Sequence, residues 1–155
     1  MLQSNPQHKS VRSLFKRPES VLVIVYTVTL DVLLICRQQP AGFWQSVTGS
    51  LEHNETPIDA AQRELLEETG LTADVVDHAT QRVYPIAKAW RKRYAAGVAE
   101  NTEHEFSVQL AERCAIKLNP AEHSQYQWLP LVEAIAYASS RTNRAALQAI
   151  LKAEG

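Results

Sequence analysis

Three glutamates near the end of one predicted helix are the residues of this sequence best suited to do chemistry. Glu64, Glu67 and Glu68 are spaced i, i+3 and i+4, so on a helix they lie on one face. Like charges placed this closely repel one another and weaken the helix. Carboxylate oxygens are the ligands that Mg²⁺ and Mn²⁺ prefer. The cluster therefore predicts a divalent metal site, although a simply solvated Glu-rich face is the alternative for these three residues alone.

The helix that carries these glutamates has signals for both of its ends. Thr56 is a good N-cap and Pro57 fits the first helical position. Gly70 can adopt the left-handed conformation that closes a helix, so the sequence predicts a helix over 57–69. An apolar stripe, expected to pack against the body of the domain, contains Ile58, Ala61 and Leu65.

A longer pattern, G-x5-E-x7-R-E-U-x-E-E-x-G-U with U a bulky aliphatic residue, surrounds the glutamates. Its fixed positions are all present, as Gly49, Glu55, Arg63, Glu64, Glu67, Glu68 and Gly70. At ordinary residue frequencies, these seven identities would arise by chance roughly once in 10⁸ to 10⁹ windows. The pattern resembles the signature of the Nudix family, hydrolases that cut a nucleoside diphosphate linked to another group. This resemblance implies an α/β (α+β) fold, the Nudix-type α/β/α sandwich with a mixed central sheet.

The resemblance also implies roles for the residues of the pattern. The expected metal ligands are the carbonyl of Gly49 and the side chains of Glu64, Glu67, Glu68 and Glu122. Glu122 lies outside the pattern, in a loop before the last strand, where many related enzymes carry a further glutamate; a solvated loop acid is the alternative, and Glu103 and Glu105 are further candidates for the role. Arg63 is expected to orient a carboxylate, with an ordinary surface ion pair as the alternative. Glu55 is expected to pair with Arg63 or to brace a ligand. The residues expected to take part in catalysis are Arg63, Glu64, Glu67, Glu68 and Glu122.

A basic and aromatic segment, K-A-W-R-K-R-Y-A-A-G-V-A-E-N-T-E, occupies residues 88–103. Arginine pairs with phosphate oxygens and aromatic side chains stack on flat rings, so the segment can bind a phosphorylated ring compound. A solvated strand with a loop is an equally good interpretation of the segment alone. The residues expected to contact a substrate, here and in two earlier segments, are Arg37, Trp44, Arg91, Arg93 and Tyr94.

Length and composition predict one ordinary globular domain. The chain has 155 residues, 45% of them hydrophobic, and a net charge of −1. That charge argues against a general nucleic-acid or membrane binder. The resemblance to the Nudix family implies a small-molecule triphosphate as the partner. We expect residues 1–17 to be a basic, flexible tail, with an organelle transit peptide as the alternative, and residues 18–155 to be a single Nudix domain. The protein is expected to be cytoplasmic, as a monomer or homodimer.

Hydrophobic patterning predicts six strands and two helices in the order β-β-β-α-β-β-β-α. The expected strands are 20–27, 32–36, 44–47, 72–83, 103–110 and 125–129, and the second helix is expected over 131–152. Cys36 and Cys114 are far apart in apolar segments and are expected to be buried, reduced thiols. The five histidines show no zinc-site spacing and are expected to be scattered over the surface.

Segments outside the signature resemble one branch of the Nudix family, the bacterial dihydroneopterin triphosphate pyrophosphatases. They are K-R-P-E-S-V-L-V-I-V-Y, F-W-Q-S-V-T-G-S-L-E, R-K-R-Y-A-A-G-V-A-E-N-T-E, Y-Q-W-L and S-S-R-T-N-R. The resemblance implies release of pyrophosphate from dihydroneopterin triphosphate, with Mg²⁺ as cofactor and Mn²⁺ as a substitute. Pterin and guanine share a hydrogen-bonding edge, so a MutT-like hydrolase that cleans the nucleotide pool is one alternative. A Nudix-fold sensor that binds nucleotides without hydrolysis is the other.

Overall fold

The computed structural model describes residues 15–154 of the chain. Its elements are β1 (Glu19–Thr27), β2 (Asp31–Arg37), β3 (Trp44–Gln45), β4 (Val47–Ser50), α2 (Pro57–Thr69), β5 (Val76–Pro85), the 3₁₀ helix η1 (Lys88–Arg93), β6 (Glu100–Leu110), β7 (His123–Pro130), α3 (Leu131–Tyr137) and α4 (Arg141–Glu154). Most of the expected tail, residues 1–14, lies outside the described residues. Its last two residues contact the domain, since the Lys16 amide donates to the Arg93 carbonyl and Arg17 donates to the Glu55 carbonyl.

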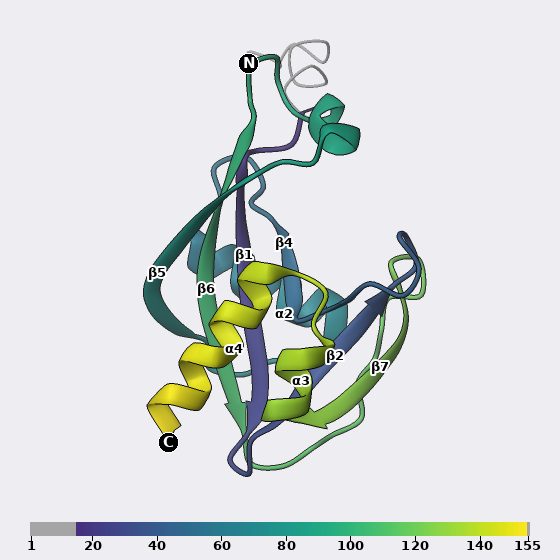
Figure 1. The fold of residues 1–155 in the computed structure, drawn as a ribbon, viewed down its shortest axis with the longest axis vertical. Helices are drawn as coiled ribbons and strands as arrows, with labels where there is room; N and C mark the ends of the chain where they lie inside the picture. Colours follow the sequence, from purple (N-terminus) through teal and green to yellow (C-terminus); the bar gives the residue numbers. More distant parts are fainter. Residues whose placement is uncertain (1–14, 155) are drawn as a thin grey trace, which may run out of the picture.

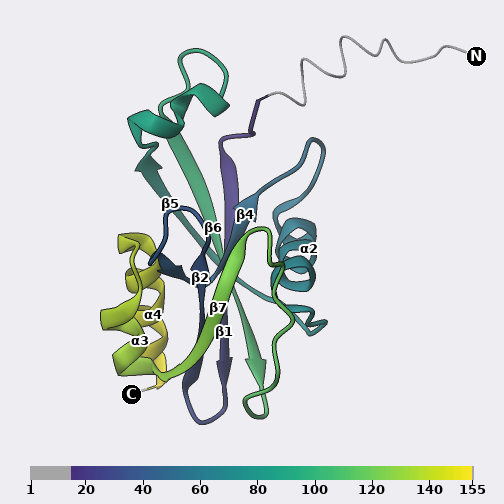
Figure 2. The same cartoon turned by 90° about the vertical axis from the view of Figure 1, so that its right-hand side faces the viewer.

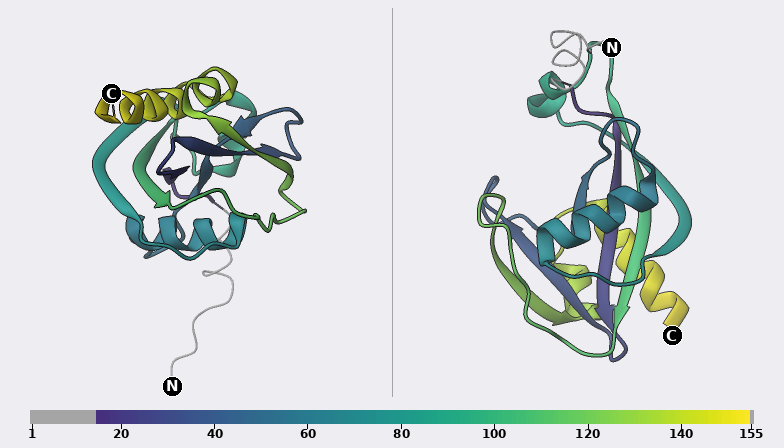
Figure 3. Two further views of the ribbon diagram at one scale, coloured as in Figure 1. Left: turned by 90° about the horizontal axis from the view of Figure 1, so that it is seen from below. Right: turned by 180° about the vertical axis from the view of Figure 1, so that it is seen from behind.

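The elements form three layers, with the sheet between two helical layers. Figures 1 and 2 show α3 and α4 on one face of the sheet and α2 on the other. The view from below in Figure 3 shows the strands between α4 and α2. The strands form one mixed sheet in the order β3-β2-β1-β6-β5, with β4 paired to β1 and β7 paired to β2. The pair β1–β6 is parallel and the other pairs are antiparallel. The expected α/β/α sandwich is confirmed.

The sheet opens between β1 and β2, and this opening positions the site. The two strands pair only at their hairpin, through Tyr26 and Val32. Beyond that point β1 pairs with β4 over residues 20–23, while β2 pairs with β3 and β7. The strands therefore diverge from the hairpin, as Figure 1 shows for β1 and β2. Side chains from both helical layers can reach into the space between them.

Two apolar clusters hold the layers together, one on each face of the sheet. Side chains alternate along a strand, so Val21 and Val23 of β1 pack with Leu65 of α2, whereas Leu22 and Ile24 pack with the C-terminal helices. Strand β1 is therefore buried on both faces, which explains its nearly continuous apolar sequence.

The helix α2 forms where its local signals predicted. Thr56 accepts a hydrogen bond from the Asp59 amide at 3.3 Å, and Pro57 occupies the first helical position. Gly70 ends the helix with φ of 75°, a left-handed conformation that costs glycine little. Ala61 and Leu65 are buried in the core on the predicted apolar stripe. The expected bounds of 57–69 are confirmed.

Two elements differ from the sequence prediction because tertiary contacts interrupt them. The expected strand at 44–47 is divided at Ser46, whose amide donates to Asn143 Oδ1 at 2.7 Å and not to a neighbouring strand. The expected C-terminal helix is two helices, since the Ser139 amide donates to the Trp44 carbonyl at 2.9 Å between them. The segment before β6 contains the short helix η1, which periodicity did not predict.

The predicted solvent exposure of two side chains was wrong. Cys114 is exposed, because it lies in the irregular segment between β6 and β7, whereas Cys36 is buried in β2 as expected; both are free thiols. His123 is buried at the start of β7, although the histidines were expected on the surface. Within residues 15–154, none of the helices has the length and apolar character that a membrane crossing requires.

Candidate active site

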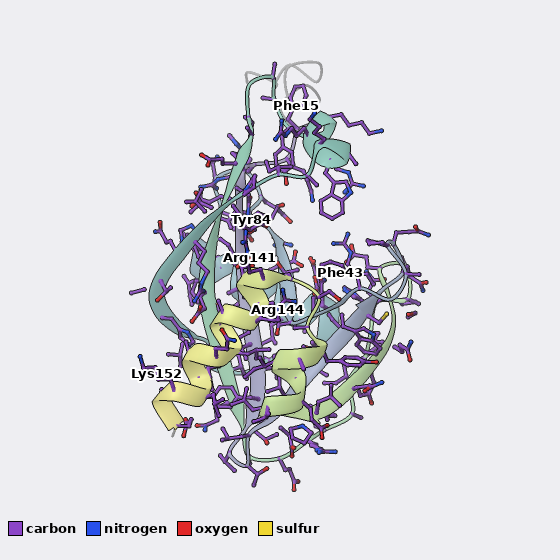
Figure 4. All side chains as sticks on the ribbon, in the orientation of Figure 1. Phe15, Phe43, Tyr84, Arg141, Arg144 and Lys152 are labelled. Atoms are coloured by element: carbon purple, nitrogen blue, oxygen red, sulfur yellow. The ribbon has the colours of Figure 1, made fainter. Side chains whose placement is uncertain are left out.

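A cavity of about 760 Å³ occupies the opening between β1 and β2. Its walls come from α2, β1, β4, β6, the segment from β5 to η1, the loops before β3 and β7, and the start of α4. Figure 4 shows three of its lining residues, Tyr84, Arg141 and Phe43, around this space. Because the walls come from both helical layers, an extended ligand in the cavity would pass through the opening in the sheet from one layer to the other.

Two of the three predicted helix carboxylates, Glu64 and Glu68, face this cavity. The residues are one helical turn apart on α2 and only 8% and 2% exposed. Their carboxyl groups lie next to each other, and Glu68 accepts a hydrogen bond from the Thr48 amide at 3.3 Å. Burial raises the pKa of both carboxyls, and the neighbouring Glu64 raises that of Glu68 further. A buried pair of acids of this kind is typical of a site that receives a cation.

Gly49 leaves the space that Glu64 occupies. A Cβ atom at position 49 would lie 2.3 Å from Glu64 Cδ and within 2.6 Å of both carboxylate oxygens. Every residue with a side chain would displace this carboxylate. The glycine of the signature is therefore required at β4 because α2 places a carboxylate against its backbone.

Arg63 connects four groups around the pair. Its guanidinium binds both oxygens of Glu55 at 2.8 Å, one oxygen of Glu64 at 2.5 Å and the Ser50 carbonyl at 3.1 Å. It also lies 3.2 Å from Glu67. The fork of N–H donors matches carboxylate oxygens. Glu55 thus pairs with Arg63, one of the two contacts expected of it, and Arg63 in turn contacts the carboxylate of Glu64.

Glu67 lies on the outer side of this arrangement. Its side chain is 52% exposed, is paired with Arg63, and does not line the cavity. Within the part of the chain that the structure describes, no group of three or more His, Cys, Asp or Glu side chains is close enough to hold a metal ion. The donors that fit a hard cation are the two buried carboxylates and the adjacent backbone of Gly49. Glu67 would have to leave Arg63 to join them.

Glu122 lines the same cavity from the loop before β7. Its carbonyl accepts a hydrogen bond from the Gln38 amide at 2.8 Å, which ties that loop to the end of β2. After burial and the effect of Glu64, the charge of Glu122 also contributes to the raised pKa of Glu68. The side chain itself is exposed, so it has the freedom to approach a bound ligand.

Three of the five expected substrate contacts line the cavity, and two do not. Arg37, Arg93 and Tyr94 lie in its wall, and the Arg37 guanidinium is 5.5 Å from the centre of the Trp90 ring. Trp44 does not line the cavity; it is buried in the core beneath α3, 5.2 Å from the ring of Tyr137. Arg91 faces away and donates to the Ile86 carbonyl at 3.0 Å.

Several residues that line the cavity were not predicted to do so, although Glu103 was a candidate for the further glutamate outside the signature. Asn101 and Glu103 of β6, His123 of β7 and Gln45 of β3 all line the cavity. The N-T-E sequence at the start of β6 places the first two on one face of the strand, because side chains alternate. The sequence therefore indicates that Asn101 and Glu103 share one face of the strand. It does not indicate that this face lines a cavity.

Comparisons with known proteins agree with this geometry. The sequence profile of the NUDIX domain matches residues 16–150. The chain is 39% identical to dihydroneopterin triphosphate diphosphatase of Escherichia coli K12 over 142 residues, which cover 86% of this chain and 92% of that protein. It is 33% identical to the enzyme of the same name from Haemophilus influenzae, covering 88% and 89%. The solved structure of the E. coli dihydroneopterin triphosphate pyrophosphohydrolase has a TM-score of 0.81 at 38% identity, covering 87% and 95%.

Proposed function

Because this chain belongs to the Nudix family, we propose that it is a metal-dependent pyrophosphohydrolase that converts dihydroneopterin triphosphate to the monophosphate and releases pyrophosphate. We propose Mg²⁺ as the metal ion, which Mn²⁺ can replace. The reaction would serve folate biosynthesis. A cytoplasmic location and assembly as a monomer or homodimer stay predictions.

One observation carries the proposal: a buried pair of glutamates faces a cavity large enough for a ring with a triphosphate. Ligand cavities of this kind have volumes of roughly 300 to 1,000 Å³, and this one measures about 760 Å³. It is lined by Glu64 and Glu68 on one wall and by basic side chains, Lys16, Arg37 and Arg93, on others. The acids can hold a cation while the bases pair with phosphate oxygens.

The metal site would consist of Glu64, Glu68 and the Gly49 carbonyl, with Glu67 or Glu122 as a further ligand. A divalent ion held there supplies positive charge for the phosphate oxygens and acidifies water. Arg63 fixes the carboxylate of Glu64, because Glu55 and the Ser50 carbonyl hold the guanidinium in turn. Water attacks the α- or the β-phosphorus, the bond from that phosphorus to the bridging oxygen breaks so that pyrophosphate is released, and a carboxylate of the cavity accepts the proton of the water. We propose Glu122 as a candidate for this base or for a ligand.

The test is a substrate panel in which released pyrophosphate is measured with and without Mg²⁺. Dihydroneopterin triphosphate is expected to have a higher kcat/KM than dGTP, and both activities are expected to disappear on chelation. Equal or reversed values would favour the pool-cleaning hydrolase. Binding of the triphosphates without hydrolysis would favour the sensor. Hydrolysis in heavy-oxygen water, followed by location of the label in monophosphate or pyrophosphate, identifies the phosphorus that water attacks.

A further inference from the structure

Three buried polar atoms of the cavity have no hydrogen-bond partner. They are Asn101 Oδ1, Glu103 Oε1 and His123 Nδ1, and among residues 15–154 they are the only buried side-chain atoms in this state. All three residues line the cavity. Buried polar atoms in folded proteins are nearly always paired, so an unpaired one calls for a specific explanation. Their concentration in one cavity indicates that a ligand supplies the missing partners.

Asn101 and Glu103 lie side by side on the wall opposite α2. They are two residues apart on β6 and therefore face the same side of the sheet. Phe106 and Val108, at alternate positions of this strand, pack in the cluster on the α2 side, so Glu103 faces the layer of α4. Its carboxyl accordingly lies near Thr142 at the start of that helix. The cavity thus has acids of α2 on one wall and the acceptors of β6 on the other.

The free atoms on β6 are acceptors with fixed positions. The carboxyl of Glu103 lies near Thr142, and its Oε1 has no protein partner. The amide nitrogen of Asn101 donates to Ser20 Oγ at 2.8 Å and to Tyr84 Oη at 3.0 Å, which leaves Oδ1 free. The two side chains are 5% and 2% exposed, so water does not compete strongly for them. A matching ligand must present two neighbouring N–H donors.

We infer that Glu103 Oε1 and Asn101 Oδ1 bind the amino group and the adjacent ring N–H of a 2-amino-4-oxo ring, the edge that pterin and guanine share. This inference rests on the proposed function and identifies the part of the cavity that selects the ring. The triphosphate of the same ligand extends toward Glu64 and Glu68 on the α2 wall. Adenine and hypoxanthine lack this pair of donors, so the site discriminates against them.

The surroundings of Glu103 favour such a ligand. Burial raises the pKa of this carboxyl, because removal from water disfavours its charged form. An N–H group of the ring at Oε1 would supply a hydrogen bond of the kind that stabilises a carboxylate. Phe43, Tyr84 and Trp90 also line the cavity and offer flat faces to the ring.

The test compares dGTP with dITP, which differ only by the 2-amino group. The wild-type protein is expected to prefer dGTP in kcat/KM by at least roughly tenfold, and Glu103→Gln to reduce this preference to roughly threefold or less. The glutamine replaces one carboxylate oxygen by an NH₂ group and removes the negative charge, so it accepts the ring N–H more weakly. Glu105→Gln is the matched control, since Glu105 lies on the same face two residues further but pairs with Arg82 and His78 and does not line the cavity. An unchanged dGTP preference in a folded Glu103→Gln protein would overturn the inference.

A binding measurement that needs neither turnover nor a variant separates this inference from the proposed function. Neopterin, which is fluorescent and carries no phosphate, is titrated against its analogue with oxygen in place of the 2-amino group. The inference requires that the wild-type protein bind neopterin at least roughly tenfold more tightly. Equal binding would overturn it even if triphosphates are hydrolysed. Conversely, selective neopterin binding without hydrolysis of any triphosphate would refute the proposed function and leave the ring site standing.

Discussion

Replacing Gly49 by alanine places a methyl group against the carboxylate of Glu64. The new Cβ would lie 2.3 Å from Glu64 Cδ, whereas carbon atoms in favourable contact are about 3.5 to 4.0 Å apart. The carboxylate must therefore move by roughly 1 Å or more. Its possible movements are restricted, because Arg63 holds one oxygen at 2.5 Å and the carboxyl of Glu68 lies next to it.

The expected effect falls mainly on turnover. A misplacement of about 1 Å at a reacting centre can cost roughly a hundredfold in rate, and we expect kcat to fall by that order in Gly49→Ala. The loss of stability should be limited, since overpacking of this size costs about 1 to 3 kcal/mol. The end of a side chain, and not the backbone, has to move.

The assay combines pyrophosphate release at saturating Mg²⁺ with urea unfolding and a Mn²⁺ titration. Gly70→Ala is the matched control, because it also replaces a glycine of the signature by alanine but lies at the C-cap of α2 and not in the cavity wall. Its φ of 75° makes alanine cost about 1 to 2 kcal/mol. We expect the control to lose stability and to keep its kcat. If Gly49→Ala kept a kcat within threefold of wild type and an unchanged Mn²⁺ affinity, the reasoning about this contact would be refuted.

Three further predictions concern the groups around the cavity. Glu68→Gln should lower turnover by roughly a hundredfold or more, about 2.7 kcal/mol of transition-state stabilisation, without unfolding the protein; unchanged rates with retained metal dependence would contradict this role. Arg63→Lys should lower the free energy of unfolding, measured by urea denaturation, by about 1.5 to 3 kcal/mol, because lysine cannot bind both oxygens of Glu55. Glu67→Gln changes an exposed side chain and should cost less than about 1 kcal/mol. His123 should make stability depend on pH: burial, assisted by the charge of Arg37, lowers its pKa from 6.5 to about 4, so the unfolded chain binds the proton more tightly and stability falls as pH decreases from 6.5 toward 4. The free energy of unfolding should fall by roughly 2 kcal/mol at pH 5. If wild type and His123→Phe lost stability equally, and only below pH 4.5 where Glu and Asp titrate, the histidine would not be responsible.

Local signals explain why the helix and the cluster of glutamates on it could be predicted. The caps of α2, Thr56 and Gly70, act within one turn of the residues they stabilise. The spacing of Glu64 and Glu68 places them on one face in any helix of this sequence. The bracing of Arg63 by Glu55 was also accessible, because the two residues belong to one short signature.

The rest of the cavity depends on contacts between distant segments. Trp44 was expected to contact substrate, but its packing under α3 depends on a tryptophan in β3 meeting a helix almost a hundred residues later. Arg91 and Arg93 are neighbours in sequence, yet only Arg93 lines the cavity, because a 3₁₀ turn points them in different directions. Neither outcome follows from residue type or local periodicity.

By itself, the sequence determined which chain segment can gather acidic groups for a cation, since helix ends and helix faces are set by residues three or four apart. Only the tertiary structure decided that Glu64 and Glu68 are buried while Glu67 is exposed, and that Asn101 and Glu103 complete the same cavity. The physical reason is that burial is fixed by which surfaces pack together. Here the divergence of β1 from β2 opens the space, and the pairing of β6 with β1 places its acceptors there.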